Sequence, residues 1–196
     1  LINSCSNTYV AVGSEIGNMF GFNTDMASMI ALCVLVGGIV GSIILGHLLE
    51  STNAHKPILV LICFMSMLSS VLICQLYDHD SKDMLAFSFA HFLFGFFVIS
   101  VVIVAYDLGV KQLNPLGESI SPTVLNMSAS AGSFVMTQLA TFFLEMDNKE
   151  GALYALWSMP IQCGTAFLIC FTFEVKFDRG NDHDKNKSNI ADVMNI

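Results

Sequence analysis

The sequence predicts an all-α membrane protein built as a bundle of six transmembrane helices. Hydrophobic residues make up 54% of the 196 residues, charged residues only 12%, and the mean hydropathy is +0.66. Soluble domains carry about 25% charged residues, so this chain has too few to coat a soluble fold. The charges also collect in short clusters between apolar segments long enough to cross a bilayer. The net charge of −8 comes with no basic patch, so we expect a lipid bilayer and no nucleic acid as partner.

The first predicted helix, residues 1–20, is the most polar of the six. Its polar side chains share one sector of a helical wheel: Asn3, Ser4, Asn7, Thr8, Ser14, Glu15 and Asn18. In lipid, such a stripe must face either other helices or a watery cavity. The carboxylate favours a cavity; the alternative is hydrogen bonding between helices through small polar groups. Because the chain begins inside an apolar segment, we expect this helix to be truncated and the start of a longer protein to be missing.

Three almost wholly apolar helices follow, over residues 26–49, 57–76 and 84–110. Gly37 and Gly41 in the first of them form a small-xxx-small pair, which predicts close approach of a neighbouring helix. His91 lies within the third. It is a candidate ligand for haem or a metal, but we favour a hydrogen bond between helices.

The fifth predicted helix, residues 121–144, carries a second polar stripe. Pro122 suits its first turn. The stripe steps by three or four residues along one face and consists of Asn126, Ser130, Ser133, Thr137 and Thr141. This face is equally consistent with lining a cavity and with packing closely on another helix. We expect the two polar helices to oppose each other across a central space.

The sixth predicted helix covers residues 153–173. The domain organisation is therefore a six-helix bundle over residues 1–174, followed by a polar tail over 175–196 that we expect to be disordered. The six cysteines form no C-x-x-C pair and lie in apolar stretches, which predicts small buried side chains and no metal site.

The positive charges predict the orientation of the bundle. If the turn at residues 50–56 is cytoplasmic, six of the eight Lys and Arg residues are inside. Both chain ends are then cytoplasmic, and Lys82 and Lys149 lie outside.

Several motifs resemble the feline leukaemia virus subgroup C receptor-related family of haem and choline carriers, within the major facilitator superfamily. The run Gly46-His-Leu-Leu-Glu50-Ser-Thr52-Asn-Ala-His-Lys56 is similar to the family's G-x-x-x-D-x-T-x-x-x-K loop. The glycine-rich run Val36–Ser42 before it resembles the family's eighth helix. The turn Asn114-Pro-Leu-Gly-Glu118 with Leu125-Asn126 is similar to Y-P-x-x-E-G-x-S-S-G-L-L-N. The resemblance extends to about Glu174 and implies the C-terminal half of a carrier.

The resemblance also implies a function. The chain would transport a small solute by alternating access in a plasma membrane, together with a missing N-terminal half of six helices. The substrate would be a choline-like organic cation, with haem as the alternative, and no cofactor is expected. Ser130 stands where the family has a pocket glutamine, and a pocket tyrosine falls at Thr8 or Tyr9. Lys111 stands where the family tends to be acidic.

Together, the stripes and the resemblance predict two sets of functional residues. Substrate would be bound by Asn7, Thr8, Tyr9, Glu15, Asn126, Ser130 and Thr137. Cytoplasmic gating would involve Glu50, Lys56, Asp107 and Lys111. A different class of function is a truncated membrane receptor or scaffold that transports nothing. An enzyme is not expected, because the spacing of the His and acidic residues fits neither a catalytic nor a metal site.

Overall fold

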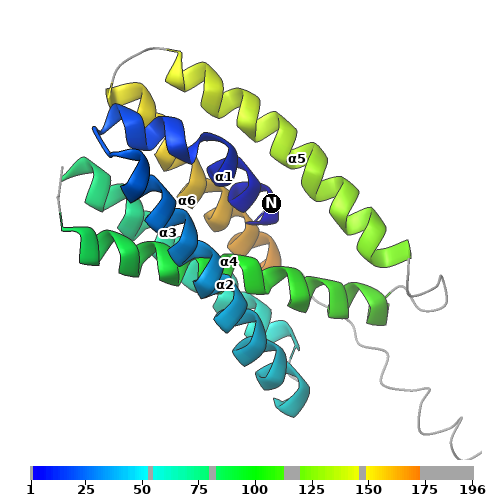
Figure 1. Ribbon diagram of the computed structural model, residues 1–196. Helices are drawn as coiled ribbons and strands as arrows, with labels where there is room; N and C mark the ends of the chain where they lie inside the picture. The colour runs from blue at the N-terminus through cyan, green and yellow to red at the C-terminus, as the bar shows by residue number, and fades with distance from the viewer. Residues whose placement is uncertain (1, 53–54, 80–82, 113–119, 146–148, 173–196) are drawn as a thin grey trace, which may run out of the picture.

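The computed structural model describes residues 2–52, 55–79, 83–112, 120–145 and 149–172. These residues form six helices, drawn in Figure 1: α1 (Ile2–Met19), α2 (Thr24–Thr52), α3 (His55–Asp78), α4 (Met84–Gln112), α5 (Ile120–Leu144) and α6 (Lys149–Thr172). The predicted tail over residues 175–196 and the turn containing Asn114 to Glu118 lie outside the described residues.

Five of these helices, α2 to α6, are long and apolar enough to cross a membrane. The 18-residue helix α1 is the exception among the described helices, because its asparagines and Glu15 lower its hydropathy. The observed helices also extend beyond the predicted spans. α2 continues through Glu50 to Thr52, and α6 begins at Lys149 instead of residue 153. Polar residues at a membrane surface can remain helical, so composition places the apolar spans better than the helix ends.

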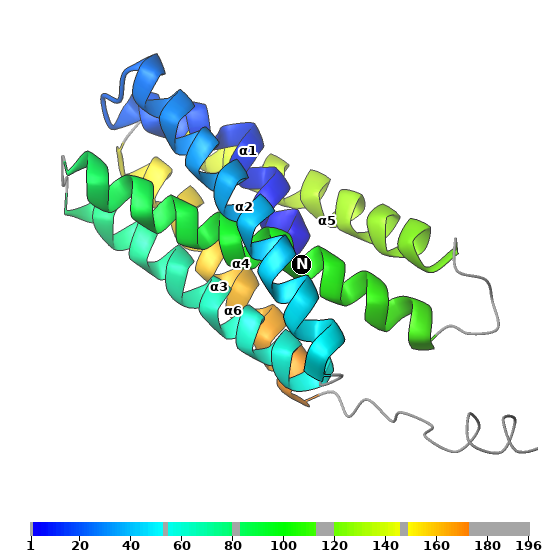
Figure 2. The ribbon, with the colours of Figure 1, turned by 60° about the horizontal axis from the view of Figure 1, so that its bottom comes forward.

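Successive helices run in alternating directions (Figures 1 and 2). One end of the bundle holds the α1–α2 turn, the end of α3 with the start of α4, and the end of α5 with the start of α6. The other end holds the remaining helix termini from α2 onward. This grouping agrees with the predicted one, while the sidedness of the membrane stays a prediction. Gly21 in the α1–α2 turn has φ 76°, a left-handed conformation that glycine adopts without strain.

The packing partners of the helices follow an internal symmetry. α2 packs on α4 as α5 packs on α1, and α3 packs on α4 as α6 packs on α1. α3 and α6 pack on each other. If α1, α2 and α3 are exchanged with α4, α5 and α6 in that order, each of these packing pairs becomes an observed pair. Because successive helices alternate in direction, α4 runs opposite to α1, α5 opposite to α2 and α6 opposite to α3. The two sets of three helices are therefore inverted relative to each other.

Glycines bring α2 and α4 into close contact. A Cβ atom at Gly37 would overlap the carbonyl group of Phe92, and one at Gly41 would overlap that of Phe96. Gly95 on α4 is equally tight against the backbone of Val34. The prediction that Gly37 and Gly41 admit a neighbouring helix is confirmed, and the neighbour is α4.

Candidate functional site

A hydrogen-bonded aromatic cluster joins α1, α3 and α4 in the core. His91 on α4 is fully buried, and its Nδ1 lies 2.7 Å from the carbonyl oxygen of Phe87. A carbonyl only accepts, so Nδ1 carries the proton and Nε2 is the acceptor. The hydroxyl of Tyr9 donates to Nε2 at 2.5 Å. The favoured role of His91, a hydrogen bond between helices, is confirmed.

The same cluster limits what His91 can bind. Both ring nitrogens are engaged, and the rings of Tyr9, Tyr77 and Phe87 lie within 6.4 Å of the imidazole, centroid to centroid. An axial haem ligand needs a free ring nitrogen at an open cleft. Coordination by His91 would therefore require breaking the bond to Tyr9 and opening the core.

The two polar helices, α1 and α5, lie in direct contact. The Ser4 hydroxyl donates to the carbonyl oxygen of Ala129 at 2.9 Å, and the hydroxyls of Thr137 and Thr8 are 3.4 Å apart. The expectation that these helices face each other across a central space is therefore wrong. Small polar side chains hydrogen-bond across the interface at these two points, as in the packing alternative.

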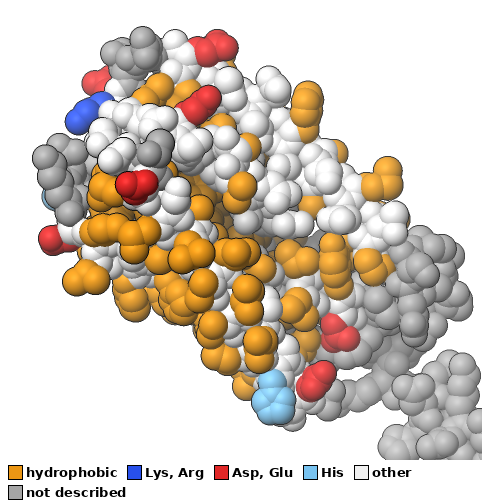
Figure 3. Space-filling model, viewed as in Figure 1, with side chains coloured by type: hydrophobic (Ala, Val, Ile, Leu, Met, Phe, Trp, Pro, Cys, Tyr) orange, Lys and Arg blue, Asp and Glu red, His pale blue; other side chains and the backbone are white. Residues whose placement is uncertain are grey.

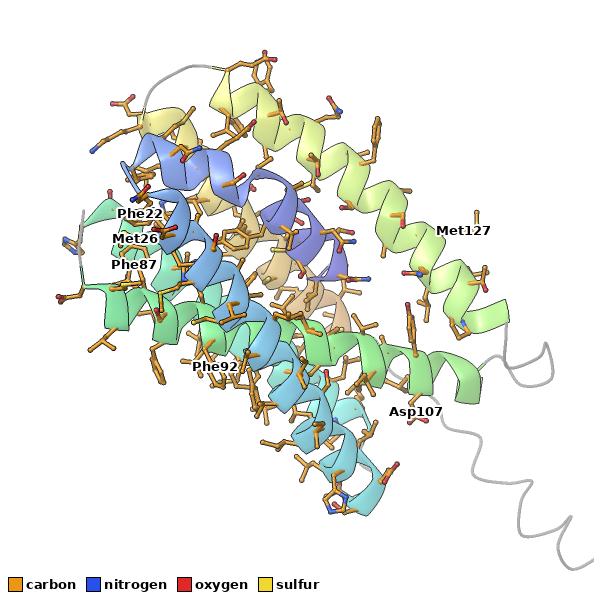
Figure 4. The ribbon with its side chains drawn as sticks, in the orientation of Figure 1. Phe22, Met26, Phe87, Phe92, Asp107 and Met127 are labelled. Carbon is orange, nitrogen blue, oxygen red and sulfur yellow. The ribbon has the colours of Figure 1, made fainter. Side chains whose placement is uncertain are left out.

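Beside this contact, α1 and α5 expose other polar side chains. We name this surface the polar face and define it by Asn7, Ser14, Glu15, Asn18, Asn126, Ser130 and Gln138, all of which are exposed. Figure 3 shows hydrophobic side chains gathered over α2 and fewer of them over α1 and α5, where exposed apolar side chains such as Phe134 and Val135 lie beside the polar face. Met127, labelled in Figure 4, is one of these apolar groups and is 69% exposed.

The predicted substrate-binding residues thus divide into two groups. Asn7, Glu15, Asn126 and Ser130 belong to the polar face. Thr8 and Tyr9 are buried, and Thr137 is half-buried between α1 and α5. Neighbours in sequence separate because a helix turns about 100° per residue, so Asn7 and Thr8 cannot share one face.

A hollow of about 490 Å³ lies where the polar face meets the end of the bundle near the α1–α2 turn. Its walls include Glu15 and Asn18 from α1, and Thr141 and Glu145 from α5. Both carboxylates are exposed. They place negative charge at the mouth of the polar face, where it would attract cations.

A smaller cavity of about 150 Å³ lies between α1 and α2. Tyr9, Phe22 and Tyr77 contribute aromatic rings to its wall, together with Gly13 and Ile30. Figure 4 shows Phe22 close to Phe87 at this end of the bundle, and their ring centroids are 5.1 Å apart. Sequence reasoning missed Phe22 and Tyr77. Each lies at an end of an apolar segment, and that position was the only available signal.

The predicted gating residues lie at the opposite end of the bundle. Glu50 is exposed in the last turn of α2, and Lys56 is half-buried at the start of α3. Asp107 is half-buried near the end of α4 (Figure 4). The side chain of Lys111 lies outside the described part of the chain. The gating role of all four stays a prediction.

Among the described residues, no group of three or more His, Cys, Asp or Glu side chains could hold a metal ion. The side chains of the polar face supply hydrogen-bonding groups and the negative charge of Glu15. The chain matches no protein-family model and no curated protein.

Proposed function

We propose that this chain is one six-helix half of a solute carrier that moves a small organic cation across a membrane by alternating access. The observation that carries this proposal is the polar face, which lies on two adjoining helices of an otherwise apolar bundle. The motifs that resemble the feline leukaemia virus subgroup C receptor-related carriers support it.

The physical argument concerns what the polar face can contact. Asn7, Asn126 and Ser130 lie within helices and are exposed. Polar groups left without partners in hydrocarbon cost several kcal/mol each, on the order of 2–7. This surface must therefore meet water or another protein. A second six-helix half facing it across a solute path would provide both.

The helix packing supports the same proposal. Carriers of the major facilitator type contain inverted three-helix repeats within each six-helix half, and substrate binds near the midplane between halves. The exchange of packing partners between α1–α3 and α4–α6, with opposite chain direction, has this character. We further propose that both chain ends lie in the cytoplasm, based on the distribution of Lys and Arg residues, and that the membrane is the plasma membrane, as the resemblance to these carriers implies.

The substrate class follows from charge and aromatic content. Glu15 and Glu145 flank the hollow at the mouth of the polar face, and Tyr9, Tyr77 and Phe22 line the cavity next to α1. Carboxylates attract cations, and aromatic faces bind quaternary ammonium groups. Because both nitrogens of His91 are engaged, haem is the weaker candidate. A choline-like cation is the substrate we propose.

Uptake measurements on a longer protein that joins this chain to a second six-helix half would test the proposal. Ser130→Leu places a bulky apolar group on the polar face and should abolish choline uptake while leaving surface expression unchanged. Thr165→Leu is the matched control, since Thr165 is exposed on α6 outside the polar face. Normal uptake of both choline and haem by Ser130→Leu would remove the polar face from the transport path.

A further inference from the structure

Two thiols from different helices meet at the α3–α6 interface. The Sγ atoms of Cys63 on α3 and Cys170 on α6 are 3.8 Å apart. Cys63 is buried, whereas Cys170 is half-buried. The two residues are 107 positions apart in sequence, so only the fold brings them together.

Both cysteines line a cavity of about 440 Å³ that is distinct from the polar face and from the aromatic cavity. It lies beside the start of α1, and α3, α4, α5 and α6 also contribute to its wall. Ala105, Leu125 and Ala166 are typical of its largely apolar lining. Exposed Ser128 and Ile169 also belong to the wall, so the cavity extends to the surface of the bundle.

The other core thiols lack this access. Cys5, Cys74 and Cys163 are as buried as Cys63, but they do not line this cavity. The thiol of Cys74 points to the carbonyl oxygen of Leu156 at 3.4 Å, and that of Cys5 points to the carbonyl oxygen of Met159 at 4.0 Å. Cys63 and Cys170 therefore combine a short sulfur–sulfur distance with a path from the surface.

The spacing of the two sulfurs suits a single bridging atom. A metal–thiolate bond is about 2.3 Å long, so an atom held equally by sulfurs 3.8 Å apart would subtend an angle of about 110°. A disulfide needs about 2.05 Å between the sulfurs, which would require these two to approach by about 1.8 Å. A bridged pair thus requires less movement of α3 and α6 than a direct bond.

We propose that Cys63 and Cys170 form a dithiol site for a soft, thiophilic metal or metalloid centre of low coordination number, with its apolar substituent held in the cavity. Thiolates select soft centres over hard ones. The described wall of the cavity contains no carboxylate or imidazole that would bind a hard cation.

The chemistry can be written for a trivalent arsenical, R–As=O. Each thiol forms one As–S bond, and the oxygen leaves as water with both thiol protons. Arsenic remains trivalent throughout, so the reaction needs neither an oxidant nor a reductant. The product is a ring that closes through both helices.

Phenylarsine oxide, added to the full chain purified in detergent, tests this site. Intact mass should show one phenylarsenic per chain. Because two sulfurs hold the arsenic, the adduct should survive excess 2-mercaptoethanol and be removed by 2,3-dimercaptopropanol. Cys63→Ser and Cys170→Ser should each lose the resistance to monothiol. Cys33→Ser and Cys163→Ser are the matched controls and should retain it.

Peptide mapping of the unsubstituted chain keeps the test independent of how the variants fold. After proteolysis of the adduct, the peptides that contain Cys63 and Cys170 should be joined through arsenic. The absence of any monothiol-resistant adduct on the unsubstituted chain would overturn the proposal. A resistant adduct on either single variant, or a bridge mapped to another pair of cysteines, would overturn it as well.

Discussion

The pairs α2–α4 and α1–α5 occupy equivalent places in the packing symmetry, yet they differ in chemistry. In α2–α4, glycines let the backbones approach until no Cβ fits at Gly37 or Gly41. In α1–α5, hydroxyl groups make the contact, with Ser4 bonded to the backbone of Ala129. Even at Gly132, the closest atom to an added Cβ is the Ser4 hydroxyl oxygen, a side-chain atom that can move.

The two pairs also differ in the chemistry of the side chains that they expose. α2 exposes Leu35, Ile39 and Ile43, which suit contact with lipid. α1 and α5 expose the amides, hydroxyls and carboxylate of the polar face next to apolar side chains such as Val10, Phe134 and Val135. One helix arrangement therefore supports a tightly packed pair with an apolar exposed surface and a second pair that also exposes polar groups. The difference indicates that side-chain chemistry, and not the arrangement of the helices, would decide which pair faces the solute in the proposed carrier.

The largest expected difference between the pairs is in access to water. Ile39 and Ser130 are both exposed and lie near the middle of α2 and α5. In the longer two-half protein embedded in lipid, Ser130→Cys should react with a membrane-impermeant maleimide at least about tenfold faster than Ile39→Cys, because the reactive thiolate forms only where water reaches it.

The labelling of the unsubstituted protein is subtracted to account for the native cysteines. Equal labelling rates for the two variants would mean that the polar face and the surface of α2 meet the same environment, and the comparison would fail.

A smaller effect should separate two glycines on the same helix. Gly41→Ala should destabilise the bundle by about 1–3 kcal/mol, because the added Cβ must displace the backbone of α4. Gly46→Ala is its control, since no atom lies within 4 Å of the Cβ added there, and Ala is favoured over Gly in helices by about 1 kcal/mol. Unfolding in detergent measures both. If Gly41→Ala matched Gly46→Ala in stability, the tight contact would not hold in solution.

Local patterns in the sequence were sufficient to predict the helices and the close contact at Gly37 and Gly41. The apolar segments and their spacing placed the five membrane-length helices, whereas α1, predicted as a sixth span, is helical but too polar to be counted with them. The i, i+4 spacing of Gly37 and Gly41 indicated a close neighbour. These features depend on composition and on helical periodicity, which are visible within a short window of sequence.

The site was harder to predict, because its contacts join distant parts of the chain. Tyr9 and His91 are 82 residues apart, and no local pattern marks one as the partner of the other. The residues of the polar stripe on α5 also have different surroundings along the helix. Thr137 contacts Thr8, whereas Ser130 remains exposed. Small polar residues suit both roles, so spacing alone leaves the alternatives equal.

The smallest expected effect is that of Glu50, a predicted gating residue on α2, on the conformational equilibrium of the proposed carrier. Glu50 lies in the last turn of α2, and α2 ends at the same end of the bundle as the labelled Asp107 on α4 (Figures 1 and 4). An exposed gating ion pair between Glu50 and its predicted partner Lys111 would contribute roughly 0–1 kcal/mol, so Glu50→Gln should leave the unfolding temperature nearly unchanged. The same energy can shift the ratio of outward-open to inward-open carrier by up to about fivefold.

Spin-label distances and choline uptake in the longer two-half protein measure this shift. His47→Gln is the matched control, since His47 is exposed one turn earlier on α2 and is not a predicted gating residue. Glu50→Gln should change the population ratio and the uptake rate, and His47→Gln should change neither. An unchanged ratio and rate in Glu50→Gln would confine Glu50 to a solvated helix end. Lys56, Asp107 and Lys111 would then remain as the predicted gating residues.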